Sequence, residues 1–207
     1  MHPYMVHGER GRNKFKCAEM ASNIYIGLVH HPIYDKRREI VATAVTNFDV
    51  HDIARCTKTF GLGGFFVITP LESQVHLVER LIRHWVEGTG SVYNPTRKES
   101  LSLVRVSRTI DEASQEISDL WQEKVRRIAT GASFHPKSIS FENLRRLFED
   151  RNTPFLLLFG TGWGLTQEVK DSSDYVLAPI EGKGYNHLSV RSAVAIILDR
   201  LLGDRAE

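Results

Sequence analysis

The chain has 207 residues, 42% hydrophobic and 25% charged, so it can bury one sizeable core or two small ones. A net charge of +2 is too small to assign a nucleic-acid partner by itself. The apolar runs fall far short of the roughly 20 residues that span a bilayer, so no membrane helix is expected. Two cysteines without metal-ligand spacing favour the reducing cytoplasm over a disulfide framework.

The N-terminal residues are mixed and polar, and they lack the apolar core of a secretory signal. We therefore expect residues 1–22 to be a disordered extension. Residues 23–207 are expected to form a single domain, because no Pro- or Ser-rich linker interrupts them. Three local basic groups could meet phosphates or simply face solvent. They are Lys36-Arg37-Arg38, Lys124 with Arg126-Arg127, and Arg145-Arg146.

Short apolar runs alternate along the chain with amphipathic segments. In chain order the pattern predicts strand 24–30, strand 40–46, helix 49–61, strand 64–69, helix 75–87, strand 101–107, helix 110–121, strand 125–130, helix 140–150, strand 155–159, helix 165–169, strand 175–179 and a final helix 190–201. Strands that alternate with helices predict an α/β fold, with a mostly parallel sheet and helices on both faces.

Turn and capping residues set the expected boundaries. Asn47 or Asp49 can cap the first helix, which should end at Gly61, and Ser140 can cap the helix that follows it. The segments 31–39 and 88–100 are read as loops because they are charged or rich in Gly, Asn and Pro. Aromatic and basic residues in these two loops could contact RNA.

A glycine cluster, Gly160-Thr161-Gly162-Trp163-Gly164, ends the apolar run 155–159. It lacks the lysine and hydroxyl residue of a P-loop. It also lacks the third glycine of a dinucleotide fingerprint, having Leu165 in that place, and too little chain follows for a dinucleotide domain. Three possibilities stay open: a weakened dinucleotide site with Glu181 near the position of the ribose-binding acid, backbone that another ligand approaches closely, or a tight turn without a ligand.

Two other predicted strand ends favour the ligand. The segment 177–193 leaves one strand end with Gly182 and Gly184, and Thr130-Gly131 ends another. If these ends lie side by side, they form a crevice lined by backbone that suits a small adenosine-bearing ligand.

These loops resemble the cofactor-binding end of SPOUT-superfamily RNA methyltransferases. The segments that carry the resemblance are 28-LVHHPIYD-35, 45-VTNFDVHDIARCTKTFG-61, 91-SVYNPTRKES-100, 160-GTGWGL-165 and 185-YNHLSVRSA-193. They look most like a small bacterial family of S-adenosylmethionine-dependent RNA methyltransferases of unassigned target. The similar region runs from about residue 23 to residue 203.

The resemblance implies a C-terminal trefoil knot, an exception to unknotted topology. It also implies a homodimer with the active site at the subunit interface. S-adenosyl-L-methionine is expected to lie in the knot against the strand-end loops. The expected contacts are Thr130, Gly131, Phe159, Gly160, Thr161, Gly162, Trp163, Gly164, Ile180, Leu188, Ser189 and Ala193.

The resemblance also suggests catalytic residues. The ribose-methylating branch carries an Asn-x-Gly-x-x-x-Arg motif; here Arg55 matches the arginine, whereas Asp49 and His51 replace the asparagine and glycine. A second motif of that branch, Asn-x-Ser, is matched by Ser189, with Asn186 one residue too early. These departures leave the methylated atom open.

Methyl transfer needs alignment of donor and acceptor and removal of one proton. The resemblance therefore gives Arg55 as a positive charge near the acceptor, and Asp49, Ser189 and Asn186 as further catalytic candidates. A surface arginine paired with Asp52 or Asp49 is the plain alternative for Arg55.

The expected substrate is structured RNA, either tRNA or rRNA, and the expected partner is a second copy of the chain. A non-catalytic RNA- or nucleotide-binding protein of the same fold and a NAD-dependent oxidoreductase are the alternatives. No metal site is expected, because no histidines have the spacing of metal ligands.

Overall fold

A computed structural model describes residues 22–204 of the chain. The predicted extension, apart from Ser22, lies outside the described residues, as does Cys17. The strands are β1 (Ile24–Val29), β2 (Ile33–Tyr34), β3 (Ile40–Val41), β4 (Gly64–Ile68), β5 (Val104–Ser107), β6 (Arg126–Ala129), β7 (Ser138–Ile139), β8 (Phe155–Gly160) and β9 (Tyr175–Leu177). The helices are α1 (Asn47–Thr59), α2 (Glu72–Val86), α3 (Thr89–Tyr93), α4 (Pro95–Leu101), α5 (Ile110–Trp121), α6 (Phe141–Phe148), α7 (Gln167–Ser172) and α8 (Val190–Leu202).

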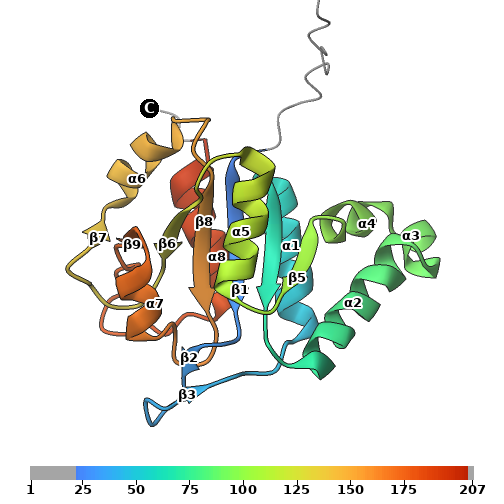
Figure 1. The fold of residues 1–207 in the computed structure, drawn as a ribbon, viewed down its shortest axis with the longest axis horizontal. Helices are drawn as coiled ribbons and strands as arrows, with labels where there is room; N and C mark the ends of the chain where they lie inside the picture. Colours follow the sequence, from blue (N-terminus) through green and yellow to red (C-terminus); the bar gives the residue numbers. More distant parts are fainter. Residues whose placement is uncertain (1–21, 205–207) are drawn as a thin grey trace, which may run out of the picture.

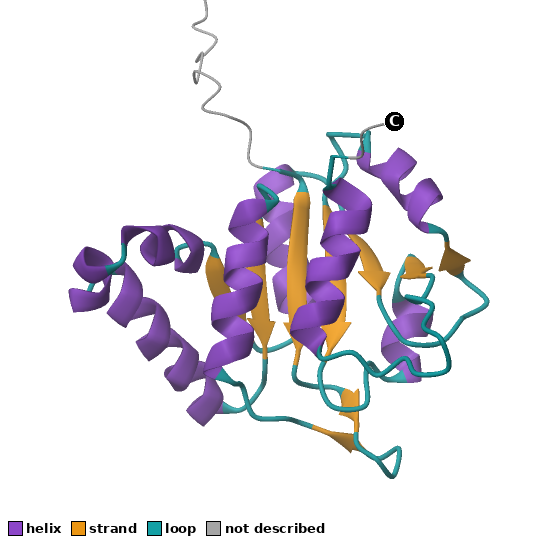
Figure 2. Ribbon diagram, turned by 180° about the vertical axis from the view of Figure 1, so that it is seen from behind, coloured by secondary structure: helices purple, strands orange, loops and turns teal. Residues whose placement is uncertain are grey.

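Seven strands form one sheet in the order β5-β4-β1-β8-β6-β9-β7, and every pairing in it is parallel. Helix α5 covers one face of the sheet, and α1 and α8 cover the other (Figures 1 and 2). The predicted α/β fold, with a parallel sheet and helices on both faces, is confirmed.

The central strands β1 and β8 are apolar on both sides because both sides are covered. In β1, Ile24, Ile26 and Leu28 pack with α1 and α8, whereas Tyr25 and Val29 face the cluster that contains α5. Full burial of each such aliphatic side chain contributes about 1.5–3 kcal/mol. The well-packed central strands therefore fix the positions at which the loops at the ends of the sheet begin.

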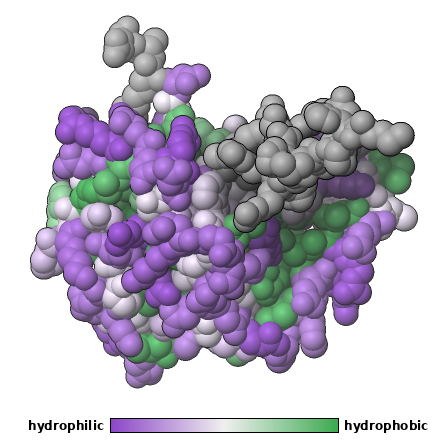
Figure 3. All heavy atoms as spheres, turned by 45° about the horizontal axis from the view of Figure 1, so that its top comes forward, coloured by the Kyte–Doolittle hydropathy of each residue, from purple (hydrophilic) through white to green (hydrophobic). Residues whose placement is uncertain are grey.

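Polar side chains cover most of the outer surface at the end of the molecule where the strands begin (Figure 3). This pattern agrees with surface helices that bury one stripe. In α8 the buried stripe is Val194, Ile197, Leu198 and Leu201. No helix within residues 22–204 is long and apolar enough to cross a membrane.

The prediction of a core strand at 40–46 is wrong. Only Ile40–Val41 is a strand, and it pairs antiparallel with β2 in a separate two-stranded ribbon. Residues 42–46 form no helix or strand. Tertiary context outweighs strand propensity in this segment, which is rich in β-branched residues, and Ile40 is 56% exposed.

The prediction of a loop at 88–100 is also wrong, because α3 and α4 occupy most of it. The side chain of Asn94 caps α4 by accepting a hydrogen bond from the backbone N–H of Arg97 (3.0 Å), and Pro95 takes the first helical position. An Asn-Pro pair reads as a turn, but it is also a helix start. Strand β5 consequently begins at Val104, later than predicted.

The N-terminal cap of α6 is the predicted residue, whereas that of α1 is not. Ser140 caps α6 as expected, through a bond from Asn143 N (3.2 Å). Helix α1 is capped by Thr46, rather than by Asn47 or Asp49. Gly61 adopts a left-handed φ of 65° directly after the end of α1, as its role as a helix stop requires.

The C-terminal part of the chain crosses back over the sheet. After β9, which lies beyond β6, the chain returns so that α8 packs against α1, α6 and β8. Figure 1 shows this return in red, behind the central strands. Such a return is what the expected trefoil knot requires.

Candidate functional site

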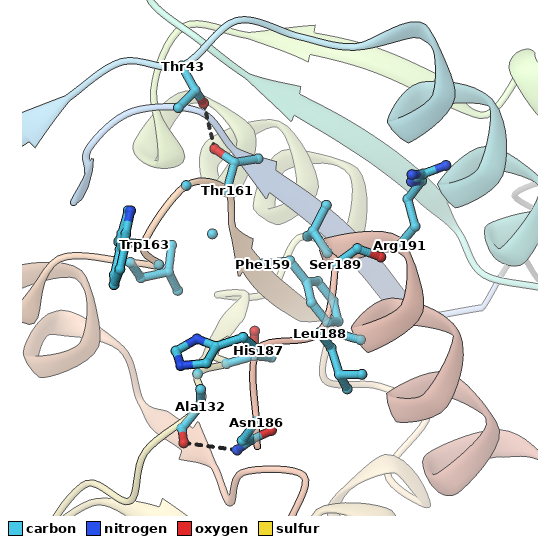
Figure 4. A pocket seen from close by; sticks show the side chains of 18 of the residues that line it. Thr43, Ala132, Phe159, Thr161, Trp163, Asn186, His187, Leu188, Ser189 and Arg191 are labelled. Carbon is cyan, nitrogen blue, oxygen red and sulfur yellow. Dashed lines mark hydrogen bonds between the residues drawn. The ribbon is translucent and has the colours of Figure 1, made fainter. Parts of the chain in front are cut away.

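A pocket of about 980 Å³ opens at the carboxyl ends of β6 and β8. Its walls come from the segment after β6, the glycine loop after β8, and the segment that leads into α8 (Figure 4). Ligands in open α/β sheets bind at this edge. The three strand ends that the sequence singled out are therefore brought together.

The glycine loop has no room for a side chain at Gly160 and Gly162. A Cβ on Gly160 would lie 2.5 Å from the backbone nitrogen of Leu165, and one on Gly162 would lie 2.8 Å from Ile33 Cδ1. Gly162 and Gly164 also have left-handed φ angles of 55° and 95°. The glycines thus put bare backbone on the pocket wall.

Strand β2 holds this loop in place. Tyr34 N donates to Gly164 O, and Trp163 N donates to Tyr34 O, both at 2.9 Å. Leu165 forms an isolated bridge with Ile33. The two-stranded ribbon is therefore the outer support of the glycine loop.

A partly buried chain of polar groups, with His30 fully buried at its inner end, lies behind the loop. The hydroxyl of Thr161 is 2.6 Å from that of Thr43 and donates to Val29 O at 3.1 Å. Thr43 Oγ1 in turn lies 2.9 Å from His30 Nδ1. Burial is the main reason that the pKa of His30 is lowered from 6.5 to about 4, against a smaller opposing effect of Asp49. His30 is therefore neutral at pH 7.

The second wall is the segment 178–189. Asn186 Nδ2 donates to Ala132 O at 3.1 Å and ties this wall to the segment after β6. Ser189 caps α8 by accepting from Ser192 N at 3.4 Å, and its Oγ is 2.9 Å from Ser192 Oγ. Both side chains line the pocket and have a local structural role there.

All twelve residues expected around the cofactor line this one pocket. They are Thr130, Gly131, Phe159, Gly160, Thr161, Gly162, Trp163, Gly164, Ile180, Leu188, Ser189 and Ala193. Trp163 is 61% exposed and lies at the rim near His187, so it does not cap the hydrophobic core. Their contacts with a cofactor stay a prediction.

Of the catalytic candidates, Asp49, Asn186 and Ser189 line the pocket, but Arg55 does not. Arg55 is exposed on α1. It also has no carboxylate within 4.0 Å in residues 22–204, so the plain alternative of pairing with Asp49 or Asp52 is wrong. Within this chain Arg55 is therefore separate from the pocket.

Those two carboxylates are paired with Arg191 instead. Arg191 Nε lies 3.2 Å from Asp49 Oδ1, and its NH1 lies 3.1 Å from Asp52 Oδ2. Arg191 lines the pocket from the first turn of α8. A cation at a helix N-terminus opposes the helix dipole, and this mismatch is the sequence signal that could have singled it out.

The sequence interpretation missed other pocket residues. Arg38 was predicted to lie in a loop, Thr43 in a core strand and Ala132 at a strand exit, and Lys170 lies just after the predicted helix 165–169. Only Arg38 belonged to a group already singled out, the basic group 36–38.

Comparison with known proteins identifies the family. Residues 23–203 match the family model described as SAM-dependent RNA methyltransferase. The chain is 46% identical over 183 residues to a protein of Oleidesulfovibrio alaskensis named tRNA (guanine-N(1)-)-methyltransferase, covering 88% of this chain and 42% of that protein. It is 39% identical to an uncharacterized protein of Aquifex aeolicus, covering 86% of this chain and 88% of that one.

The chain spans about two-fifths of the length of the named relative. Solved structures agree with the fold. A probable methylase family protein of Haemophilus influenzae superposes with a TM-score of 0.59 at 19% identity, covering 88% of this chain and 66% of that one. A TrmH/SpoU tRNA modifying enzyme of A. aeolicus gives 0.53 at 14% identity, covering 87% and 74%. The chain belongs to the family of S-adenosylmethionine-dependent RNA methyltransferases.

Proposed function

We propose that this protein transfers a methyl group from S-adenosylmethionine to tRNA in the pocket at the carboxyl ends of β6 and β8. The observation that carries the proposal is the glycine-lined pocket of about 980 Å³. It brings together all twelve residues expected around the donor. Its bare backbone at Gly160 and Gly162 fits an adenosine-bearing donor, because backbone N–H and C=O groups can recognise the adenine edge and the ribose. The name of the 46% identical relative supports tRNA as the substrate class.

The bound donor would supply an electrophilic methyl group, and the chain must align an acceptor with it. Phe159, Ile180 and Leu188 give the pocket an apolar side, in which Phe159 is buried and Leu188 is exposed. Asp49, whose side chain is only 15% exposed, faces the same pocket and is the carboxylate that we propose takes the acceptor proton. Its pairing with Arg191 fixes its position.

We further propose that Ser189 and Asn186 shape the donor site. Ser189 holds the N-terminus of α8 in the pocket wall, and Asn186 ties the wall to Ala132. Loss of either bond would loosen a wall that must keep donor and acceptor within reach of each other.

Arg55 requires a separate proposal. Because it does not line the pocket of its own chain, we propose that it serves the pocket of a second copy in a homodimer. Its fixed positive charge and planar guanidinium suit an RNA phosphate or a developing negative charge. If its substrate is tRNA, we propose that the protein acts in the cytoplasm.

The test begins with calorimetric titration of the purified protein with S-adenosylmethionine, S-adenosylhomocysteine and NAD. We expect both sulfur compounds to bind and NAD not to bind; binding of NAD alone would overturn the proposal. Tritiated donor should then label tRNA from cells that lack this protein. Donor binding without labelling of any RNA would favour a non-catalytic RNA-binding role.

The acceptor atom follows from one comparison. Mass spectrometry of nucleosides from cells with and without the protein should show one methylated nucleoside that depends on it. A methylated guanine base would agree with the name of the relative, whereas a 2′-O-methyl nucleoside would agree with the ribose branch.

A further inference from the structure

The three basic groups of the sequence have different surroundings. In the second group, Arg126 pairs with Asp174 at 3.1 Å and Arg127 pairs with Asp111 at 2.5 Å. In the third, Arg146 pairs with Glu142, and Arg145 donates to the carbonyl of Arg200. The arginines of these two groups are thus engaged within the fold.

The first group, residues 36–38, is different. No carboxylate of residues 22–204 lies within 4.0 Å of its three cationic groups. Asp35 is next to it, but its Oδ1 accepts from the backbone nitrogens of Arg37 (2.7 Å) and Glu39 (2.9 Å) and so closes the turn. The positive charge of residues 36–38 is therefore available to bind an anionic ligand.

Arg38 is held in a conformation that side chains rarely adopt. Its φ is +67°, which costs a residue other than glycine on the order of 1 kcal/mol or more. Its guanidinium carbon lies 4.6 Å from the centroid of the Tyr34 ring. Tyr34 is itself fixed, because its hydroxyl accepts from Gln167 N at 3.2 Å. The backbone conformation and the contact with Tyr34 therefore fix the position of the Arg38 side chain, which lines the pocket.

Lys170 of α7 lines the same pocket. Its Nζ lies 3.5 Å from where a Cβ on Gly131 would stand, so it extends over the segment after β6. Burial is the main cause that lowers the pKa of Lys170, and the positive charge of Arg38 lowers it further. Two cations that repel each other therefore share one side of the pocket, with no carboxylate of the described residues within 4.0 Å of either.

We propose that Arg38 and Lys170 form a phosphate-binding site that holds the RNA backbone beside the methyl-donor pocket. The proposal rests on the proposed function, since it takes RNA as the substrate. Arg38 is exposed at the tip of the ribbon, so a large ligand can reach it from solvent while Lys170 meets the same anion from inside the pocket. Planar guanidinium and ammonium groups are the usual phosphate ligands.

The test compares RNA binding of Arg38→Asn and Lys170→Gln with that of the unaltered protein. Asparagine suits the left-handed φ of position 38 and so keeps the turn while removing the charge. The probe is total tRNA from cells that lack this protein, titrated at several salt concentrations in the presence of S-adenosylhomocysteine. Each lost phosphate contact should reduce the slope of log affinity against log salt by about 0.7–0.9. We expect each variant to bind tRNA about tenfold more weakly.

Arg37→Gln is the matched control, because it removes one charge from the same turn but from a side chain outside the pocket. It should change the affinity for tRNA much less than Arg38→Asn does. Equal losses in both variants would mean a diffuse charge effect and would overturn the site. Unchanged tRNA affinity and salt slope in Arg38→Asn and Lys170→Gln would also overturn it.

The carboxylate of the donor is the other anion that this pair could meet. S-adenosylhomocysteine carries that carboxylate, and methylthioadenosine does not. If the two variants weaken binding of the first compound but not of the second, and leave tRNA binding unchanged, the pair serves the donor and the proposal is wrong. Unaltered protein that binds S-adenosylhomocysteine but no tRNA would instead overturn the proposed function together with this site.

Discussion

The hydroxyl oxygens of Thr43 and Thr161 lie 2.6 Å apart. Thr43 follows the ribbon strand β3, and Thr161 belongs to the glycine loop after β8, so this bond joins two segments that are far apart in the chain. Thr161 also donates to Val29 O, and Thr43 is bonded to His30. The pocket wall thus depends on a small polar group whose members support one another.

Removing either hydroxyl should weaken the fold. We expect Thr43→Val and Thr161→Val each to lower the free energy of unfolding by about 1 kcal/mol, because valine keeps the shape but leaves a partner unsatisfied. The double variant should lose less than the sum, since the second change removes a group that has already lost its partner. Urea unfolding measures all three values. Thr43→Ser, which keeps the hydroxyl, is the control, and strictly additive losses would contradict the coupling.

The protein should become less stable in mild acid because of His30. The pKa of His30 is lowered to about 4 in the folded chain, so between pH 6.5 and 4 the unfolded chain binds more protons than the folded one. This stability is present above pH 6.5 and is lost as the pH falls towards 4. The loss due to His30 alone should be about 2 kcal/mol between pH 7 and pH 5.

His30→Asn isolates this contribution, because asparagine keeps a polar group near the position of Nδ1 but does not titrate. Denaturant unfolding of both proteins at pH 7 and pH 5 gives the comparison. Other groups, such as His51, whose pKa is also lowered mainly by burial, titrate in both proteins and cancel. The same pH dependence in both proteins would show that His30 is not the cause.

Gly160→Ala should strongly weaken donor binding. The new Cβ would stand 2.5 Å from Leu165 N and 2.8 Å from the carbonyl carbon of Gly164, so the glycine loop would have to move. We expect calorimetry to show at least a hundredfold weaker binding of S-adenosylhomocysteine, from a loss of about 3 kcal/mol in loop geometry and contacts.

Gly131→Ala is the stability control for that variant. A Cβ at residue 131 would meet only the end of the Lys170 side chain, at 3.5 Å. Its melting temperature should stay close to that of the unaltered protein, whereas that of Gly160→Ala should fall. Undiminished donor binding by Gly160→Ala would mean that the loop is not the donor site.

Arg55→Ala should remove methyl transfer and leave donor affinity unchanged, since Arg55 does not line the pocket. If Arg55 acts across a homodimer, mixing Arg55→Ala with Gly160→Ala after unfolding and refolding should restore activity. A mixed dimer contains one intact site, made of the pocket of the first variant and the arginine of the second. Filter assays with tritiated donor and tRNA measure the recovery. No recovery from a mixture that binds the donor would contradict the action of Arg55 across a dimer, and full turnover by Arg55→Ala alone would place Arg55 outside the mechanism.

Much of the fold could be predicted from sequence because the central strands are unambiguous. β1, β4 and β8 are short, apolar runs buried on both sides, and such runs between amphipathic helices favour a parallel sheet. The segment 40–46 is rich in β-branched and small residues and was also predicted as a core strand. That prediction is wrong because composition does not show whether both sides of a segment will be covered. The prediction of a loop around Asn94-Pro95 was wrong because the same residues are typical of a turn and of a helix start.

The residues of the candidate site also fall into two groups, those with a local sequence signal and those whose position depends on the tertiary fold. The glycine loop could be found because tight turns have local signals, and Ser189 could be found through the resemblance to the Asn-x-Ser motif. Arg38 and Arg191 have only weak local signals, a basic group and a cation at a helix N-terminus, and Lys170 has none. Their place in the pocket depends on which distant segments the sheet order brings together. The pairing of Arg191 with Asp49 joins α8 to α1 and has no counterpart in local spacing.

The pocket wall contains Thr43 near one end of the described chain and Ala193 near the other. No part of the chain can therefore make the site before α8 has docked against α1. A ligand in this pocket would bind only the completed fold and would slow the opening of both ends at once. Hydrogen exchange should accordingly show that the donor protects amides in β1 and in α8 together, as one cooperative unit.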